Sequence, residues 1–111
     1  MSDNDRLKMI EDMLQQNPKD SFLQYAAALE YERAGDPSKA ITTINHLLSL
    51  DPNYLGAYYK LGGLYEAAGE EAKAIEVYKK GRVLAKEKKD PKTLGELTEA
   101  LMLLDADDDI W

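Results

Sequence analysis

Few side chains in this sequence could carry acid–base, nucleophilic or metal chemistry. The chain has one histidine, His46, and no cysteine, which excludes a thiolate nucleophile, a thiolate metal site and a disulfide framework. His46 stands between Asn45 and Leu47. We interpret it as a residue of a partly exposed helix face rather than as an acid–base catalyst.

The carboxylates are numerous, but their spacing favours structural roles. Glu70 and Glu71 stand where a helix is expected to begin, and negative charge there complements the helix dipole. Asp105, Asp107 and Asp109 alternate like the first ligands of a calcium loop, but the glycine and the final glutamate of such a loop are missing. The sequence also lacks a glycine-rich phosphate loop. We therefore expect no enzyme activity, no metal, no cofactor and no small-molecule substrate.

Length and charge narrow the class of protein. The 111 residues suffice for one small domain, and the formal net charge of −7 argues against nucleic acids and anionic membranes as partners. The first residues, MSDNDRLKMIEDML, lack the basic start and apolar run of a secretory signal. No stretch approaches the roughly 18 consecutive apolar residues of a membrane span. The expected location is the cytoplasm.

An internal repeat organises the middle of the chain. Residues 21–54 and 55–88 align without a gap, with nine identities in 34 positions that cluster around Gly35 and Gly69. The identical pairs are Tyr25/Tyr59, Tyr31/Tyr65, Glu32/Glu66, Ala34/Ala68, Gly35/Gly69, Lys39/Lys73, Ala40/Ala74, Ile41/Ile75 and Leu50/Leu84. A repeat of this period is typical of stacked helical units.

Each copy of the repeat is expected to form two helices. In the second copy, apolar residues at helical spacing end at Gly69, which supplies a left-handed residue, and the next helix begins near Glu71. In the first copy, Asp36 is a suitable N-cap and Pro37 suits the first helical position. The segment Asp-Pro-Asn at residues 51–53 then breaks the chain before the second copy.

These features resemble the tetratricopeptide repeat, a helix–turn–helix unit of about 34 residues with the pattern W-x2-L-G-x2-Y…A-x3-F…P. The second copy places these residues at the signature positions: Tyr58, Leu61, Gly62, Tyr65, Ala74 and Tyr78. The first copy is looser and keeps Tyr31, Ala40 and Pro52. Small residues at the Ala28/Gly62 and Ala40/Ala74 positions are expected to let the paired helices approach closely.

The flanking segments are expected to complete the stack. Residues 4–17 have apolar residues at helical spacing, and we interpret them as the second helix of an N-terminal half-repeat. Residues 90–104 begin with a cap, Asp90, and a proline, and lack the repeat signature, so we interpret them as a capping helix. The predicted fold is all-α: a right-handed α-solenoid of tetratricopeptide repeats with terminal capping helices. It forms a single domain over residues 1–104, followed by an acidic tail over 105–111.

In the family that this sequence resembles, the first helix of each unit lines a concave face on which partners bind. By this resemblance, the candidate partner-binding residues are Phe22, Tyr25, Leu29, Glu32, Tyr59, Gly63 and Glu66. Rigid aromatic side chains bind with little loss of entropy, and the missing side chain at Gly63 would let a ligand backbone come close. The expected function is a non-enzymatic protein–protein interaction module, a scaffold that binds a peptide or a helix.

One known use of the family's concave face is not expected here. Some members hold the C-terminal carboxylate of a chaperone peptide with lysine and asparagine side chains on their first helices. The corresponding positions in this sequence hold Tyr25, Leu29 and Gly63. The sequence therefore does not favour a carboxylate clamp.

Three other arrangements remain open from the sequence. A second copy could pair with the apolar face or with an end surface, which would make the chain a self-assembly element. The chain's own last helix could fill the groove, because Leu94 and Leu97 need a surface to cover. The acidic tail could also fold back, aided by the basic stretch 79–92, so that Ile110 and Trp111 fill an aromatic groove. The sequence names neither the partner nor the oligomeric state.

Overall fold

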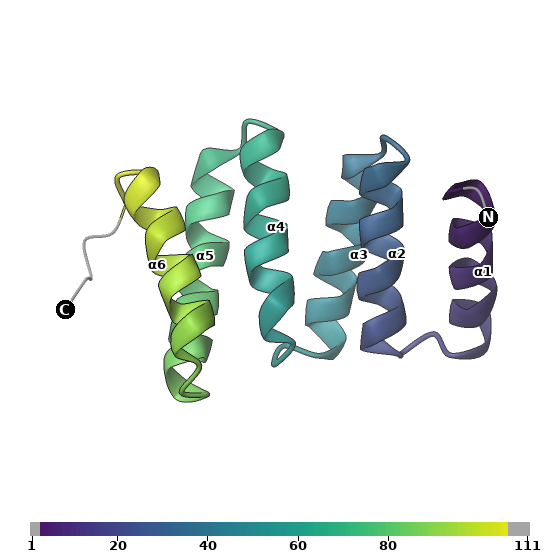
Figure 1. The fold of residues 1–111 in the computed structure, drawn as a ribbon, viewed down its shortest axis with the longest axis horizontal. Helices are drawn as coiled ribbons and strands as arrows, with labels where there is room; N and C mark the ends of the chain where they lie inside the picture. Colours follow the sequence, from purple (N-terminus) through teal and green to yellow (C-terminus); the bar gives the residue numbers. More distant parts are fainter. Residues whose placement is uncertain (1–2, 107–111) are drawn as a thin grey trace. The chain divides into compact units, whose positions relative to one another are not determined.

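The computed structural model describes residues 3–106, with side chains from residue 5 onward. The described residues form six α-helices and no strand (Figure 1). Their bounds are α1 (Asp3–Gln16), α2 (Ser21–Arg33), α3 (Pro37–Leu50), α4 (Leu55–Ala67), α5 (Glu71–Glu87) and α6 (Pro91–Leu103). The predicted all-α fold class is confirmed. The predicted contact of Ile110 and Trp111 with a groove lies outside the described residues.

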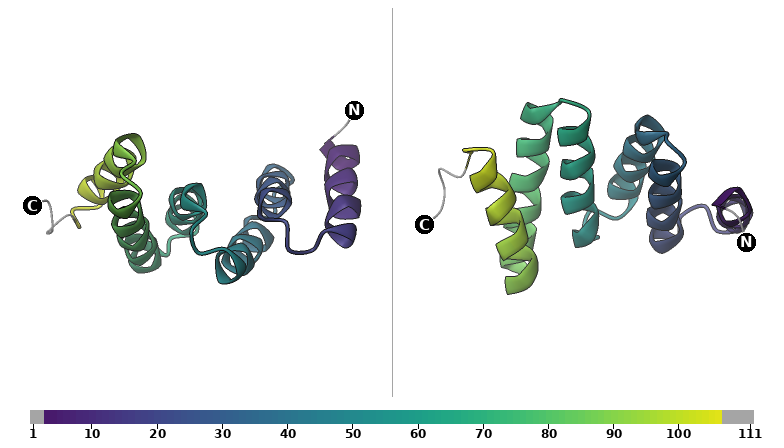
Figure 2. Two further views of the ribbon diagram at one scale, coloured as in Figure 1. Left: turned by 90° about the horizontal axis from the view of Figure 1, so that it is seen from below. Right: turned by 45° about the horizontal axis from the view of Figure 1, so that its top comes forward.

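The chain divides into two compact units after Tyr54, between the two copies of the repeat. In the first unit α2 packs against both α1 and α3. In the second unit α5 packs against both α4 and α6, and α4 makes a smaller contact with α6. Figure 2 shows the three helices of each unit from two further directions. In the described part of the chain, no helix combines the length and the apolar character needed to cross a membrane.

Aspartate side chains begin three of the helices. Asp20 accepts a hydrogen bond from the Leu23 backbone N–H at 3.0 Å and caps α2. Asp36 and Asp90 cap α3 and α6 in the same way, and a proline follows each of them in the first turn. These caps satisfy backbone N–H groups that have no partner inside the helix. The predicted caps at Asp36 and Asp90 are confirmed.

The first helix of each repeat ends at a glycine with a left-handed backbone. Gly35 has φ 87° and Gly69 has φ 79°, a region in which a Cβ atom is strained. Around Gly35, the Asp36 N–H donates to the Tyr31 carbonyl at 2.9 Å, and the equivalent bond after Gly69 joins Glu70 to Tyr65 at 2.8 Å. These turns reverse the chain so that α3 packs back on α2, and α5 on α4.

A close contact of the second unit lies between α4 and α5. A Cβ atom added to Gly62 would stand 2.1 Å from Cε1 of the Tyr78 ring, so only glycine allows this approach. Tyr78 is 2 % exposed there. In the first unit the equivalent positions hold Ala28 and Ile44, both buried. The second copy therefore combines a larger side chain, Tyr78, with a smaller residue opposite it, Gly62. Close packing requires this compensation in volume.

The third helix of the second unit packs on α5 through a second small residue. A Cβ atom at Gly81 would lie 2.7 Å from Cβ of Tyr58 on α4 and 3.2 Å from Cδ1 of Leu97 on α6. Leu97 and Leu101 are completely buried. Gly81 therefore lets α4 and α6 both approach α5, and this arrangement positions the site described below.

The neighbouring glycines of α4 offer a matched test of the close contact. Replacing Gly62→Ala should lower the free energy of unfolding by about 1–3 kcal/mol, because the new methyl group overpacks against Tyr78. Gly63→Ala should instead raise it by up to about 1 kcal/mol, because alanine is the better helix former and its Cβ would meet only the Tyr78 hydroxyl at 4.0 Å. Urea denaturation followed by circular dichroism measures both.

The double variant Gly62→Ala/Tyr78→Ile recreates the pair found in the first copy of the repeat. It should be more stable than Gly62→Ala alone, since the smaller side chain makes room for the added methyl group. Equal stability of Gly62→Ala and Gly63→Ala would show that the ring does not occupy the place assigned to it.

Candidate functional site

Four of the predicted binding residues lie along one face of α2. Phe22 is 69 % exposed, and Leu29 and Glu32 are partly exposed. The Tyr25 ring lies 5.4 Å from the ring of Tyr54, centroid to centroid. Burial raises the pKa of the Tyr25 hydroxyl, and the charge of Glu32 raises it further. The α2 face therefore combines an exposed phenyl ring with a tyrosine pair whose hydroxyl groups stay protonated at neutral pH.

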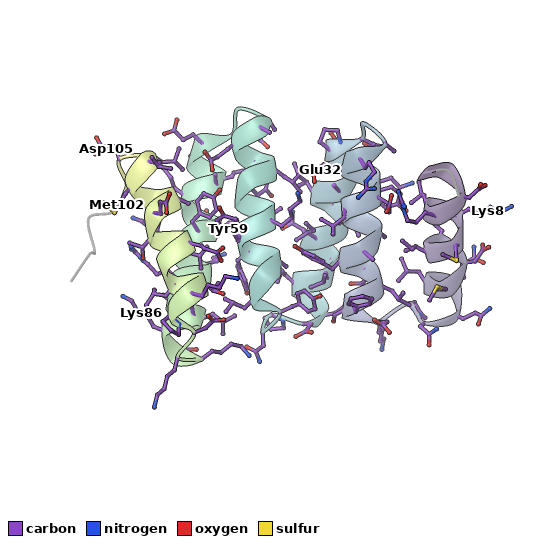
Figure 3. All side chains as sticks on the ribbon, viewed as in Figure 1. Lys8, Glu32, Tyr59, Lys86, Met102 and Asp105 are labelled. Carbon is purple, nitrogen blue, oxygen red and sulfur yellow. The ribbon has the colours of Figure 1, made fainter. Side chains whose placement is uncertain are left out.

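The other three predicted residues lie on one face of α4, in the second unit. Tyr59 is 44 % exposed, and Gly63 and Glu66 are exposed as well. The Tyr59 ring, labelled in Figure 3, lies 6.1 Å from the ring of Tyr78. The Tyr78 hydroxyl donates a hydrogen bond to the Glu66 carboxylate. Tyr78, which the sequence places at a signature position of the repeat, thus contacts both Tyr59 and Glu66, the predicted residues on either side of Gly63.

A cavity of about 290 Å³ lies beside these residues. Its lining comes from α4, α5 and α6: Tyr59, Glu66, Tyr78, Glu96, Glu99, Ala100 and Leu103. Two aromatic rings and three carboxylates therefore surround one small space, which favours a positively charged guest. We call this space the Tyr59 cavity.

The hydroxyl of Tyr78 is held in its protonated form. Burial raises its pKa above the usual range, and the hydrogen bond to Glu66 and the charge of that carboxylate raise it further. The hydroxyl is consequently a permanent donor at neutral pH. It fixes the Glu66 carboxylate beside the Tyr59 ring and leaves the second carboxylate oxygen available to a ligand.

The last helix forms a wall of this site and does not cover it. Leu97 of α6 is completely buried beside Gly81 of α5, where its Cδ1 atom would lie 3.2 Å from a Cβ atom added to the glycine. Tyr59 remains 44 % exposed beside it. In the second unit α6 therefore leaves part of the predicted α4 face open. Leu103 and Ala100 of α6 instead line the Tyr59 cavity.

A larger cavity, of about 870 Å³, lies in the first unit and was not predicted. It is bounded by α1 and α3 with α2 as its floor, and its lining is Lys8, Glu11, Asp12, Leu14, Gln15, Pro18, Gln24, Tyr31, Thr42, Thr43 and His46. The Tyr31 hydroxyl donates to the Glu11 carboxylate at 2.8 Å across the α1–α2 contact. The one sequence signal for the Tyr31–Glu11 hydrogen bond is an aromatic residue at a packing position of α2.

The first unit also contains a buried carboxylate. Glu30 is 7 % exposed, and Arg6 of α1 lies 2.8 Å from it, measured between Nε and Oε1. The pair fixes the register of α1 on α2, because a buried charge without a partner is costly. Within residues 5–106, no group of three or more histidine or acidic side chains is arranged to hold a metal ion.

Comparisons with known proteins agree with the repeat seen in the sequence and the structure. The tetratricopeptide repeat family matches residues 22–64 and, in a second form, residues 55–81. The TPR repeat-containing protein PA0015 of Pseudomonas aeruginosa is 28 % identical over 96 residues, covering 86 % of this chain and 91 % of that protein. The coverage of both chains shows that PA0015 is of similar length to this chain.

Solved structures share the fold. The crystal structure of a tetratricopeptide repeat domain protein from Salinibacter ruber is 35 % identical, with a TM-score of 0.73 over 80 % of this chain and 99 % of that one. The TPR2B domain of yeast Sti1, solved in a complex with pHsp70, is 20 % identical with a TM-score of 0.69, covering 85 % of this chain and 81 % of that one. The all-α tetratricopeptide fold class is thereby confirmed.

The bond between Tyr31 and Glu11 predicts a pH dependence of stability. Burial, first, and the hydrogen bond to Glu11 raise the pKa of Tyr31 to about 12, against about 10 in an unfolded chain. The fold therefore favours the protonated hydroxyl. The protonated hydroxyl contributes fully to the free energy of unfolding below about pH 10, and this contribution is lost as the pH rises through about 12.

The variant Tyr31→Phe should lower the free energy of unfolding by about 1 kcal/mol at pH 8, because it removes one hydrogen bond to a charged group. The difference from the unmodified chain should shrink as the pH rises from 10 to 12. Urea titrations across this pH range measure the difference in the free energy of unfolding. Adding Glu11→Gln to Tyr31→Phe should leave the pH dependence of stability the same as in Tyr31→Phe alone. A difference that persists undiminished at pH 12 would refute the assignment.

Proposed function

Because the chain belongs to the tetratricopeptide repeat family, whose members are generally non-catalytic protein–protein interaction modules, we propose that it binds a peptide segment of a partner protein. Each unit offers one candidate surface on its first repeat helix: Phe22, Tyr25, Leu29 and Glu32 on α2 in the first unit, and Tyr59, Gly63 and Glu66 on α4 in the second. The observation that carries the proposal is the Tyr59 cavity, in which predicted residues meet side chains of α5 and α6.

The lining of the Tyr59 cavity points to the chemistry of the partner. A lysine or arginine side chain would lie against the Tyr59 ring and pair with Glu96 or Glu99, so that ring and carboxylates act on the same positive charge. The volume of about 290 Å³ matches a side chain rather than a folded element. We therefore assign a basic residue of the partner to this cavity.

Gly63 suits the backbone of such a peptide. It is exposed, lies on α4 between Tyr59 and Glu66, and has no Cβ to keep a ligand backbone away. Glycine in a helix interior costs about 1 kcal/mol relative to alanine, and no close neighbour in the fold accounts for it, unlike Gly62. A binding role explains why this position does without a side chain.

The α2 face of the first unit is a separate, more apolar candidate surface. Phe22 is 69 % exposed, and Tyr25, whose ring lies 5.4 Å from that of Tyr54, is on the same face of α2. Buried aromatic anchors contribute much of the binding energy at protein interfaces. The solved complex of the yeast Sti1 domain with pHsp70 supports binding as a use of this fold.

A second candidate function is self-assembly through the ends of the chain. Met9 and Met13 on α1 are 45 % and 44 % exposed, and Met102 and Leu103 on α6 are 58 % and 80 % exposed. Exposed apolar side chains of this size favour association. A net charge of −7 on every copy opposes it, so we rank it second.

The assignment predicts a preference for basic peptides. The probe is a fluorescein-labelled 12-residue alanine/serine peptide with one central arginine, compared with peptides carrying lysine, norleucine or glutamate at that position. Fluorescence anisotropy should give tighter binding for arginine and lysine than for norleucine, and none for glutamate. The double variant Glu96→Gln/Glu99→Gln should weaken arginine binding by about tenfold or more, roughly 1.4 kcal/mol.

Glu76→Gln/Glu87→Gln is the matched control, because these two exposed carboxylates of α5 do not line the cavity. It should bind the arginine peptide like the unmodified chain. Equal binding of all four peptides, or equal loss in both double variants, would contradict the proposal. Analytical ultracentrifugation of the same samples tests the second candidate, which requires a dimer or larger species without peptide.

A further inference from the structure

The cavity of about 870 Å³ in the first unit lies on a different face of α2 from the predicted binding residues. Its lining includes Gln24 and Tyr31, which are two helical turns apart, roughly 10 Å along the axis of α2. The side chains of Phe22 and Tyr25 leave α2 in other directions, because a helix turns by about 100° per residue. The volume is usual for a ligand-binding pocket. We call this space the Gln24 cavity.

Gln24 has an acceptor atom without a partner in the wall of this cavity. The residue is only 3 % exposed, and its Nε2 donates to the Pro18 carbonyl at 2.7 Å. This bond identifies the other atom of the amide as the oxygen, because a carbonyl can only accept. Within the described part of the chain, the Oε1 atom accepts no hydrogen bond. Buried polar groups are normally paired, so this oxygen indicates a guest that brings a hydrogen-bond donor.

The hydroxyl groups of the lining also have no hydrogen left to offer. Those of Thr42 and Thr43 donate to carbonyl oxygens of their own helix, at 3.1 Å and 2.7 Å. The Tyr31 hydroxyl donates to the Glu11 carboxylate at 2.8 Å. A hydroxyl group has one hydrogen and two lone pairs, so each of the three can only accept from a guest. These bonds make the cavity a better match for donors than for acceptors.

The charge of the first unit adds to this preference. The lining contains two carboxylates, Glu11 and Asp12, against one lysine, Lys8. Lys39, whose Nζ lies 4.6 Å from the centroid of the Tyr31 ring, does not line the cavity. The whole first unit includes nine acidic and five basic residues. A guest with a positive charge and several N–H donors is therefore favoured.

Two hydrogen bonds show that acceptors occur at both ends of the Gln24 cavity. The bond from Gln24 to Pro18 marks one end, and the bond from Tyr31 to Glu11 marks the other. The free oxygen of Gln24 and the Glu11 carboxylate are thus about two helical turns apart along α2. An extended arginine residue spans seven bonds from its backbone nitrogen to the end of its guanidinium group, about 9 Å. One arginine can therefore bring donors to both ends.

We propose that the Gln24 cavity binds an arginine residue of a peptide, with the backbone N–H on Gln24 Oε1 and the guanidinium group at Glu11 and Asp12. A guanidinium group has five donors and no acceptor, and it pairs with carboxylates through two parallel hydrogen bonds. A lysine residue is one bond shorter and carries its charge on a single nitrogen, so it fits less well. This site goes beyond the proposed function and does not depend on the Tyr59 cavity, because it lies in the other unit.

A modest rotation of the Gln24 amide opens this contact. The Oε1 atom is buried in the free chain. The last side-chain torsion of glutamine has a broad minimum, so the amide plane turns at little cost. The oxygen then faces the guest while Nε2 stays within reach of the Pro18 carbonyl. Binding therefore gives the buried oxygen a partner without breaking the hydrogen bond that holds the amide.

Nuclear magnetic resonance of the full chain, labelled with nitrogen-15, tests the proposal. The probe is N-acetyl-arginine N-methylamide, which should shift the side-chain NH₂ signals of Gln24 and the backbone signal of Thr43 until they saturate. The citrulline and lysine analogues should bind about tenfold more weakly or worse, as expected when a charge-assisted hydrogen bond is lost. The arginine probe methylated on its backbone nitrogen should lose a similar factor, because it has no N–H for Gln24.

Two variants of the chain and one matched control complete the test. Asp12→Asn should weaken binding of the arginine probe by about tenfold, because it removes one of the two carboxylates. Asp5→Asn is the control, since Asp5 is an exposed carboxylate of α1 outside the lining, and it should bind like the unmodified chain. Glu96→Gln/Glu99→Gln alters only the Tyr59 cavity and should leave the Gln24 shifts unchanged. The two sites are thereby tested separately.

Three results would overturn the proposal. The first is the absence of saturable shifts at Gln24 and Thr43 when the arginine probe is added to the unmodified chain. The second is equal binding of the arginine probe and its citrulline, lysine or backbone-methylated analogue. The third is an equal loss of binding in Asp12→Asn and Asp5→Asn, because the effect would then come from the net charge and not from the cavity.

Discussion

The second unit depends on one close contact, the Tyr78 ring of α5 lying where the side chain of residue 62 would otherwise be. Because Gly62 has no side chain, α4 and α5 approach closely enough to bury the ring almost completely. The ring then has its hydroxyl at the Glu66 carboxylate, and its centroid lies 6.1 Å from that of the Tyr59 ring. A packing requirement of the helix pair thus also determines where an aromatic ring and a carboxylate stand on the exposed face of α4. Gly81, one turn after Tyr78 on α5, likewise has no side chain and lets α6 approach α5. Side chains of α6 then complete the lining of the Tyr59 cavity.

The same logic explains why the two units differ. In the first unit the counterparts of Gly62 and Tyr78 are Ala28 and Ile44. Both are buried, and this pair fills the space between α2 and α3 without a polar group. There the hydrogen-bonding tyrosine is Tyr31, and it reaches Glu11 of α1 instead. Each unit consequently joins a tyrosine hydroxyl to a carboxylate across a helix contact, but on different helices. The large cavity of the first unit is an open space lined by α1, α2 and α3, whereas the acidic cavity of the second unit is lined by α4, α5 and α6.

The sequence predicted those features that depend on residues close together in the chain. The caps at Asp36 and Asp90 and the left-handed glycines at positions 35 and 69 follow from local backbone chemistry. It missed the hydrogen bond from Tyr78 to Glu66, because that bond depends on side-chain directions across two helices. It also missed the turn at Asp105, since an aspartate with a positive φ is a much weaker signal than a glycine. The wall that α6 adds to the Tyr59 cavity depends on Leu97 reaching Gly81, a contact between residues 16 positions apart.

The position of the Tyr78 ring can be observed directly in the proton spectrum of the two adjacent glycines. Nuclear magnetic resonance should show the Gly62 Hα signals displaced by the ring current of Tyr78, whereas those of Gly63, whose built Cβ is 4.0 Å from only the hydroxyl, should lie near ordinary helical values. Tyr78→Leu should return the Gly62 signals to those values. Undisplaced Gly62 signals in the unmodified chain, or signals that do not respond to Tyr78→Leu, would contradict the contact and with it the origin of the acidic aromatic cavity.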